Sequence, residues 1–448
     1  MSGPELITLG CRLNIAESES MRALAADQDD LVIVNSCAVT AEAVRQTRKA
    51  IRRAKLARPD ARIVVTGCAA QIEPQTFARM PEVARVVGNI EKYSASSFRH
   101  SRESGNPASS STAQGSGIPA FAGMTETSAS FPAHALAFVE VQNGCDHRCP
   151  FCIIPYGRGD SRSVPAGLVV DRIKALVDRG FNEVVLTGVD VTSYGPDLPG
   201  SPSLGMLVDR ILRLVPDLPR IRLSSLDSVE IDDRLFDLLT GESRMMPHLH
   251  LSLQSGDDMI LKRMKRRHSR AQAVAMVERL KAARPEIAIG ADIIAGFPTE
   301  TDAMFENSLR LIDECDIVHG HIFPYSPRAG TPAARMPQVD PGISKARAKL
   351  LREASGKRQA AWLQSLSGTI QNVLIERDGQ SGHAENFAWV KLNISRRASE
   401  GWHPSKPVSS SEPWRDPSLR WGDAELAGKI IPLRITAASA THLTGIPA

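Results

Sequence analysis

The sequence has no apolar stretch that approaches the roughly 18 residues of a membrane span. Its first residues also lack the charged and apolar regions of an export signal. These absences argue against membrane-spanning and exported proteins. We therefore expect a cytoplasmic location and no membrane partner.

Cysteine is scarce, with seven residues among 448, which argues against a disulfide framework. A reducing compartment, where oxygen-sensitive metal clusters survive, fits this usage better. A strong excess of one charge is also missing, because the formal net charge is only +4. That balance permits a nucleic-acid partner without requiring one. The length predicts about three domains of ordinary globular composition.

Three cysteines lie close together in a C-x3-C-x2-C pattern: Cys145, Cys149 and Cys152. A four-iron cluster ordinarily takes four cysteines, so three leave one iron free to bind a small molecule. The aromatic Phe151 just before the third cysteine is part of the pattern. The alternative is a zinc site or a chance grouping, although zinc sites usually come as paired C-x2-C knuckles with a fourth ligand.

Three further cysteines each follow a short apolar run in the N-terminal region: Cys11, Cys37 and Cys68. The runs at 5–9, 31–34 and 62–65 alternate with helical stretches such as 40–57, which predicts a parallel sheet buried on both faces. Ligands of such sheets bind beyond the carboxyl ends of the strands, so these thiols should converge as a second triad. The alternative is that they are small buried residues at strand ends.

The seventh cysteine, Cys315, follows a predicted helix at 303–314 and has no other cysteine at ligand spacing. Free cysteine is often buried as a small apolar side chain. We expect Cys315 to be structural.

The central region predicts six strand–helix units. The expected strands are 138–142, 183–187, 221–225, 249–253, 287–295 and 317–323, and the expected helices include 169–179, 206–214 and 271–283. Six units are too few for an eight-stranded barrel, so we expect a partial (β/α)6 barrel with its chemistry at the carboxyl-terminal rim.

The C-terminal region changes character after a basic helical stretch at 345–364. Strands predicted at 370–375, 388–394 and 429–436 indicate a small all-β barrel. Segments 99–133 and 396–423 are rich in Ser, Gly, Ala and Pro and exceed ordinary loop lengths, which predicts a linker and an insert. The expected domains are therefore 1–98, 134–365 and 366–448.

Four motifs resemble those of the methylthiotransferase family of radical S-adenosylmethionine (SAM) enzymes: Thr8–Asn14 (TLGCRLN), Val34–Thr40 (VNSCAVT), Val65–Gln71 (VTGCAAQ) and Gly144–Tyr156 (GCDHRCPFCIIPY). The resemblance implies an α/β fold with a flavodoxin-like N-terminal domain, a partial radical SAM barrel and a TRAM-like RNA-binding barrel. It also implies two [4Fe–4S] clusters, held by the six motif cysteines, with SAM bound at one of them.

The sequence segments 152–159 and 186–194 are most similar to those of the threonylcarbamoyladenosine tRNA methylthiotransferases. This implies 2-methylthiolation of N6-threonylcarbamoyladenosine beside the anticodon, with tRNA and a reducing electron donor as partners. Open alternatives are methylthiolation of isopentenyl-adenosine in tRNA, methylthiolation of a ribosomal-protein aspartate, and a non-catalytic iron–sulfur module that binds RNA. The electron donor, the sulfur source and the oligomeric state are not predicted.

No catalytic residue beyond the cluster ligands is predicted. Residues near the barrel rim are candidates for holding SAM: Gly188, Asp190, Gln254 and Asp292, together with Phe151. Each glycine or aspartate could instead belong to a turn or a helix cap.

Two basic stripes are candidates for binding RNA phosphates. One shares a helical face at Arg45, Arg48, Lys49 and Arg52, and the other is Lys265, Arg266 and Arg267. The alternative for each stripe is a solvated surface.

Overall fold

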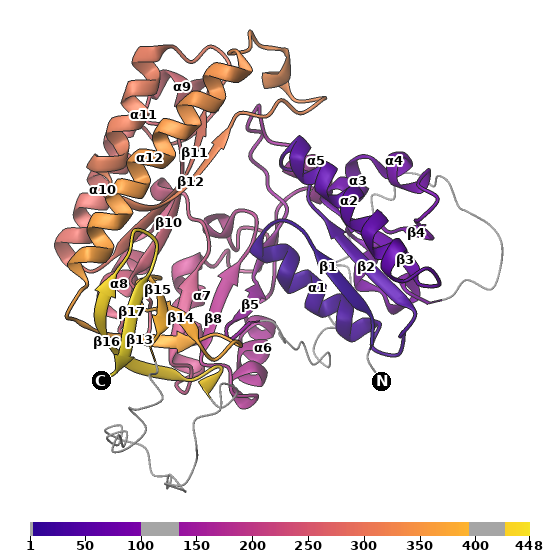
Figure 1. Cartoon of the computed structure of the whole chain (residues 1–448), viewed down its shortest axis with the longest axis horizontal. Helices are drawn as coiled ribbons and strands as arrows, with labels where there is room; N and C mark the ends of the chain where they lie inside the picture. Colours follow the sequence, from indigo (N-terminus) through magenta and orange to yellow (C-terminus); the bar gives the residue numbers. More distant parts are fainter. Residues whose placement is uncertain (1–2, 100–133, 394–425) are drawn as a thin grey trace, which may run out of the picture.

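The computed structural model describes residues 3–99, 134–393 and 426–448 (Figure 1). Apart from Arg99, the segments predicted as linker and insert, 99–133 and 396–423, lie outside these ranges. No helix of the described part is long and apolar enough to cross a membrane.

The N-terminal part is a parallel sheet, as predicted. Its strands follow one another in consecutive order: β1 (Glu5–Thr8), β2 (Leu31–Ser36), β3 (Arg62–Gly67) and β4 (Arg85–Val86). Two apolar clusters form on opposite faces of the sheet, one under α1 (Arg12–Leu24) and one under α2 (Ala41–Ala57). Helix α2 begins where Thr40 Oγ1 accepts a hydrogen bond from the Ala43 amide at 3.1 Å. Shorter helices complete this part: α3 (Cys68–Ile72), α4 (Pro74–Ala78), η1 (Glu91–Tyr93) and η2 (Ala95–Ser97).

Six parallel strands form the central partial barrel, which confirms the expected fold. They are β5 (Ala137–Glu140), β8 (Glu183–Thr187), β9 (Arg220–Leu223), β10 (His248–Gln254), β11 (Ala288–Ala295) and β12 (Ile317–Pro324). Hydrogen bonding divides them into β5-β8-β9 and β10-β11-β12. Parallel bridges from Ile221 to Met245 and from Leu226 to Leu251 connect the two halves.

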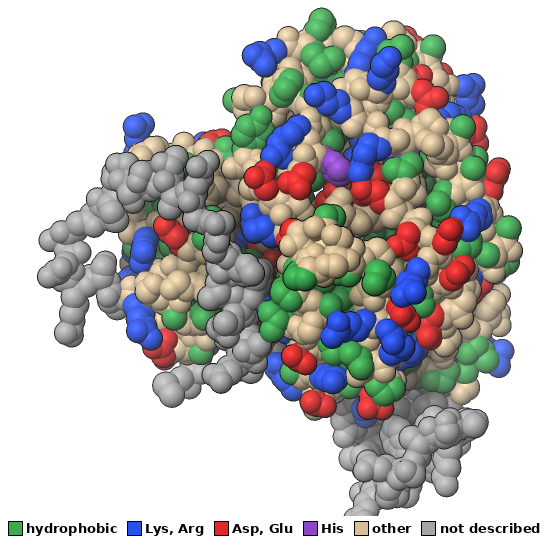
Figure 2. All heavy atoms as spheres, turned by 180° about the vertical axis from the view of Figure 1, so that it is seen from behind, with side chains coloured by type: hydrophobic (Ala, Val, Ile, Leu, Met, Phe, Trp, Pro, Cys, Tyr) green, Lys and Arg blue, Asp and Glu red, His purple; other side chains and the backbone are tan. Residues whose placement is uncertain are grey.

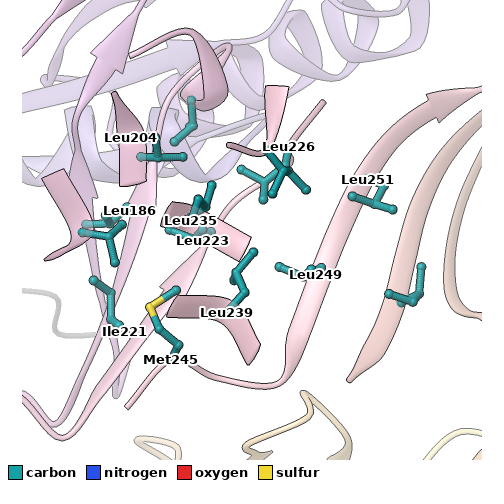
Figure 3. Close-up of a cluster of buried hydrophobic side chains, with 14 of the residues drawn as sticks. Leu186, Leu204, Ile221, Leu223, Leu226, Leu235, Leu239, Met245, Leu249 and Leu251 are labelled. Atoms are coloured by element: carbon teal, nitrogen blue, oxygen red, sulfur yellow. The ribbon is translucent and has the colours of Figure 1, made fainter. Parts of the chain in front are cut away.

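Helices cover the outside of this barrel and bury its main core. They are α6 (Ala166–Asp178), α7 (Leu204–Leu214), α8 (Asp233–Gly241), α9 (Asp258–Arg263), α10 (Arg270–Ala283), α11 (Asp302–Glu314) and α12 (Pro341–Ser365), with the short η4 (Val191–Ser193), η5 (Ser228–Glu230) and η6 (Pro332–Arg335). Leu186, Leu223 and Leu249 of the strands meet Leu204, Leu235 and Leu239 of α7 and α8 (Figure 3). Cys315 is fully buried in the same core, in line with the expected structural role.

In the sequence, a short antiparallel pair of strands lies between the first two barrel strands, β5 and β8. It consists of β6 (Gln142–Asn143) and β7 (Arg162–Ser163), and the loop between them contains α5 (Ile154–Arg158). The C-x3-C-x2-C segment therefore lies on an excursion from the barrel rim.

The C-terminal part is a closed five-stranded barrel, as predicted. Its strands are β13 (Ile370–Ile375), β14 (Ser381–Ala384), β15 (Trp389–Leu392), β16 (Ile430–Ala438) and β17 (Leu443–Pro447). Strands β14 and β17 were not predicted from the sequence. These strands are short and contain serine, glycine, histidine or proline, so their strand propensity is weak.

Candidate active site

The three N-terminal cysteines lie at the carboxyl ends of neighbouring parallel strands. Cys11 is the N-cap of α1, Cys37 follows β2, and Cys68 begins α3 directly after β3. Gly10 allows the first loop to approach the second, because an added Cβ on it would come within 3.1 Å of Cys37 Sγ. The three thiols are also electrostatic neighbours, since charge on Cys68 or Cys11 would raise the pKa of Cys37. The structure thus brings this triad together.

The environment of Cys11 and Cys37 in this first triad disfavours free thiolates. Burial raises the pKa of Cys37 to about 11, and burial also raises the pKa of Cys11. The nearby Arg158 guanidinium opposes both shifts. Coordinated metal deprotonates thiols outright, so these side chains suit a cationic cluster better than a free-thiol reaction.

The second triad is held by tight turns. Gly144, at φ +72°, is packed so closely that an added Cβ would lie 1.9 Å from the Asp160 carbonyl oxygen. The Cys145 amide donates to the Gly159 carbonyl at 3.1 Å, and the Cys152 amide donates to the Cys149 carbonyl at 3.0 Å.

Burial also affects two thiols of the second triad. Burial, reinforced by Asp190, raises the pKa of Cys145 to about 12, and burial raises the pKa of Cys152 to about 11.

The two triads are neighbours. Helix α5, which follows Cys152, packs against α3, which begins at Cys68. At the contact, an added Cβ on Gly157 would lie 3.2 Å from the Cys68 Cβ atom. A charge on Cys68 would raise the pKa of Cys152, which also places the two groups near each other. The two groups of thiols are therefore close to each other where α3 contacts α5.

A buried ion network beside the triads was not predicted. Glu17 and Lys92 have fully buried side chains and are joined by a 2.7 Å contact between Lys92 Nζ and Glu17 Oε1. The Arg158 Nη1 atom donates to Glu17 Oε1 at 2.6 Å, and its Nη2 atom donates to Asn14 Oδ1 at 2.7 Å. Asn14 Oδ1 also accepts from the Cys11 thiol at 3.4 Å.

The network thus places the Arg158 guanidinium close to Cys11 of the first triad. Its members come from α1, η1 and α5, so no spacing in the sequence connects them.

The residues predicted to hold SAM lie in different parts of the structure. Asp190 is beside the second triad: its Oδ2 atom lies 3.9 Å from Cys145 Sγ and 2.8 Å from His147 Nε2. Gly188 is packed against β6, because an added Cβ would lie 2.7 Å from the Gln142 carbonyl oxygen. This chain-to-chain contact accounts for the glycine without a ligand.

The remaining candidates lie around the barrel interior. Gln254 ends β10 at φ +67°, and the Phe151 ring packs edge-on against Phe297 with centroids 6.0 Å apart. Asp292 lies on β11, where His250 Nε2 contacts its Oδ1 atom at 3.1 Å and His321 Nδ1 does so at 3.5 Å. Asp190 is thus the carboxylate adjacent to the second triad, whereas Asp292 belongs to a histidine group.

The first basic stripe lies on the outer side of α2. Arg45 and Arg52 have side chains that are each 64% exposed, and they form surface ion pairs with Glu42 and Glu82. Arg48 is 3.5 Å from Glu73, and Lys49 is exposed. Such pairs are weak and leave the basic groups accessible to phosphates.

The second basic stripe is largely engaged within the fold. Arg266 Nη2 donates to Asp227 Oδ2 and to the Ser252 carbonyl, both at 2.8 Å. Arg267 is paired with Asp227 and Glu230, whereas Lys265 is exposed. On the face shown in Figure 2, basic and acidic side chains are interspersed.

Two family models match the chain: "Radical SAM superfamily" over residues 139–312 and "Uncharacterized protein family UPF0004" over residues 5–88. The "Threonylcarbamoyladenosine tRNA methylthiotransferase MtaB" of Rickettsia prowazekii (strain Madrid E) is 50% identical over 395 residues, covering 87% of this chain and 91% of that protein.

Two more distant likenesses were found. A "tRNA-2-methylthio-N(6)-dimethylallyladenosine synthase" of Erythrobacter litoralis (strain HTCC2594) is 32% identical, covering 98% of this chain and 95% of that protein. The solved structure of the radical SAM methyltransferase TsrM from Kitasatospora setae shares 17% identity with a TM-score of 0.49, covering 75% of this chain and 77% of that chain.

The geometry agrees with the cofactors that these relatives imply. Six thiols gather as two groups of three, and three thiolates leave one iron of a four-iron cluster without a protein ligand. The chain therefore belongs to the tRNA methylthiotransferase family of radical SAM enzymes, whose cofactors are two [4Fe–4S] clusters and SAM.

Proposed function

We propose that this enzyme adds a 2-methylthio group to N6-threonylcarbamoyladenosine next to the anticodon of tRNA. The observation that carries the proposal is the 50% identity to a relative named for that reaction, against 32% for a relative named for the dimethylallyladenosine reaction. Both relatives are covered over more than nine-tenths of their length, so the likeness extends across the whole domain set.

The six motif cysteines would divide the work between two clusters. Cys145, Cys149 and Cys152 would hold the cluster that binds SAM, with Asp190 positioned beside Cys145 to accept hydrogen bonds from the SAM amino group. Cys11, Cys37 and Cys68 would hold the cluster that delivers sulfur. When bound, these groups supply radical chemistry that can act on an inert aromatic carbon–hydrogen bond, and the protein supplies binding, orientation and water exclusion.

The adjacency of the triads supports a single substrate position between them. The target adenine would be unstacked from the anticodon loop, because enzymes that modify a base act on single-stranded or flipped-out bases. The contact between α3 and α5 supports this arrangement, and Arg158 would contribute positive charge beside the first triad.

The tRNA would lie along basic groups of α2, namely the exposed Arg45, Lys49 and Arg52 and the half-buried Arg48. Lys265 would add a contact from the barrel rim, whereas the internal pairing of Arg266 and Arg267 argues for a mainly structural role. We further propose domains at 1–98, 134–365 and 366–448, a cytoplasmic location and a separate reducing partner as electron donor.

Nucleoside analysis of tRNA tests the proposal. A strain lacking the gene should lose the 2-methylthio form of threonylcarbamoyladenosine, and the wild-type gene should restore it. A gene encoding Cys149→Ala should not. Loss of the 2-methylthio isopentenyl nucleoside instead would favour the dimethylallyl reaction.

An unchanged tRNA profile together with loss of methylthiolation on a ribosomal-protein aspartate would favour a protein substrate. Purified, reconstituted protein that releases no 5′-deoxyadenosine from SAM and reductant would favour a non-catalytic RNA-binding module.

A further inference from the structure

The inner face of the partial barrel is polar. On β9 and β10 apolar residues alternate with charged or polar ones, as in Arg-Ile-Arg-Leu at 220–223 and His-Leu-His-Leu at 248–251. The leucines and isoleucine belong to the outer core under the helices. Because successive strand residues point to opposite faces, the arginines and histidines point to the barrel interior.

The acidic groups of this interior already have basic partners. Glu183 Oε1 accepts from Arg222 Nε at 2.8 Å, and Arg220 Nη1 lies 3.7 Å from Glu183 Oε2. Asp292 is in contact with His250 and His321, as described above. Both carboxylates are thus engaged by other basic groups; they are also near enough to Arg12 to favour its charge, but burial and the neighbouring Arg222 outweigh them and lower the pKa of Arg12.

Arg12 is a cation without such a partner. It lies in the first turn of α1, half-buried, next to Cys11 of the first triad. Within residues 3–99, 134–393 and 426–448 no hydrogen bond or ion pair engages its guanidinium, and its Cζ atom is 5.4 Å from the centroid of the Phe387 ring. An unpaired guanidinium in a partly desolvated position favours a bound anion.

Phe387 is held rigidly beneath Arg12. It lies in the turn between β14 and β15 at φ +68°, a left-handed conformation that is rare for a bulky residue and persists only where packing enforces it. Its ring stacks on His383 and His248, with centroids 4.4 and 4.8 Å away, and Arg222 Cζ is 4.9 Å from it. The C-terminal barrel thus supplies a fixed aromatic surface at the barrel interior.

From this geometry we infer that Arg12 binds the carboxylate of the threonylcarbamoyl substituent and so determines substrate specificity. The inference rests on the proposed function. A guanidinium whose neighbour is an aromatic ring keeps its planar donors free, and these donors match a carboxylate in bidentate geometry. The dimethylallyl substituent has no anionic group, and its entry would bury Arg12 without a partner, which disfavours that substrate.

The test compares two anticodon stem-loop RNAs with reconstituted enzyme, one carrying threonylcarbamoyladenosine and one carrying its methyl ester. The ester removes the negative charge and adds one methyl group. Wild-type enzyme should prefer the acid by about 10- to 100-fold in kcat/KM, the range expected for one charge-assisted hydrogen-bonded pair. Equal use of acid and ester by the wild type overturns the assignment without any need for a variant.

Substitutions then assign the preference to Arg12. Arg12→Gln should lose most of the preference for the acid by losing activity on the acid alone, whereas Arg12→Lys should keep part of it. Arg213→Gln, on the exposed side of α7 with a side chain that is 70% exposed, is the matched control and should behave as wild type. A preference that persists in Arg12→Gln overturns the inference.

Two readouts separate recognition from damage to the neighbouring Cys11. Iron and sulfide content, and release of 5′-deoxyadenosine in the absence of RNA, should be unchanged in Arg12→Gln. A loss of iron in this variant would assign Arg12 to cluster support and contradict a recognition role. If the wild type modifies neither RNA but modifies an isopentenyl-adenosine RNA, the proposed function itself fails.

Discussion

At the scale of single residues, the two groups of thiols should have separable roles. Cys149→Ala should abolish release of 5′-deoxyadenosine, because the SAM-binding cluster loses a ligand. Cys37→Ala should retain that release and lose methylthiolation, because only the sulfur-delivering group is affected. Product analysis by chromatography after anaerobic reconstitution checks both outcomes.

Cys315→Ala is the control for these two variants. Cys315 is buried in the central core and far in sequence from both triads, so its loss should leave the iron content unchanged. A folded Cys37→Ala protein that loses both activities equally would contradict the division of labour.

The buried Glu17 carboxylate should be essential for stability. Burial opposes its ionisation, but the charges of Arg158 and Lys92 outweigh burial and hold the pKa of Glu17 below its ordinary range. Glu17→Gln leaves two buried cations without their counter-ion, which should cost about 3–5 kcal/mol of unfolding free energy. Denaturant titration at neutral pH measures this loss.

The pH dependence of the unfolding free energy provides a second test of the same ion network. Because the folded-state pKa of Glu17 is lowered, its contribution is fully present above the ordinary glutamate pKa and is lost as pH falls below it. The difference between wild type and Glu17→Gln should therefore shrink only in acid. The surface variant Glu42→Gln should match wild type throughout.

At the scale of elements, the turn that begins the second triad depends on one glycine. Gly144→Ala would place a Cβ 1.9 Å from the Asp160 carbonyl oxygen at a φ of +72°, so the loop must move. We expect iron loss from the SAM-binding cluster and little release of 5′-deoxyadenosine. Gly167→Ala in α6, where nothing lies within 4 Å, should keep both. Iron quantification distinguishes the two variants.

Element positions were largely predictable from periodicity. The strand predicted at 183–187 matches β8, and that at 370–375 matches β13, because β-branched and apolar runs bounded by turns leave few alternatives. Strands β14 and β17 were missed because barrel closure, not local propensity, makes them strands. Pairing with neighbouring strands of the barrel stabilises these two strands, and their own sequences do not indicate this pairing.

Much of the site was less predictable. The convergence of Cys11, Cys37 and Cys68 followed from their places after parallel strands. The Glu17 network and the Arg12–Phe387 contact join residues from distant elements, and only the folded chain reveals them. The second basic stripe shows the same limit, because Asp227, about 40 residues away in sequence, neutralises Arg266 and Arg267.

At the scale of the whole molecule, tRNA binding should depend on the outer side of the N-terminal part. Lys49→Gln removes one exposed phosphate contact, so it should weaken binding to all tRNA sequences and reduce the slope of log affinity against log salt by about one. Lys349→Gln on α12, with a side chain that is 76% exposed, should change neither. Fluorescence anisotropy across a salt series checks both, and an unchanged slope for Lys49→Gln would place the RNA elsewhere.

The junction of α3 with α5 has a mechanical consequence. Separating the N-terminal sheet from the central barrel would require breaking both that contact and the solvent-free pairing of Glu17 with Arg158. Because such a rupture is costly, hinge opening between these two parts is not a practical route for loading RNA. We therefore expect the target base to reach the thiols without a hinge movement, so catalytic turnover should be limited by how readily the base unstacks rather than by domain motion.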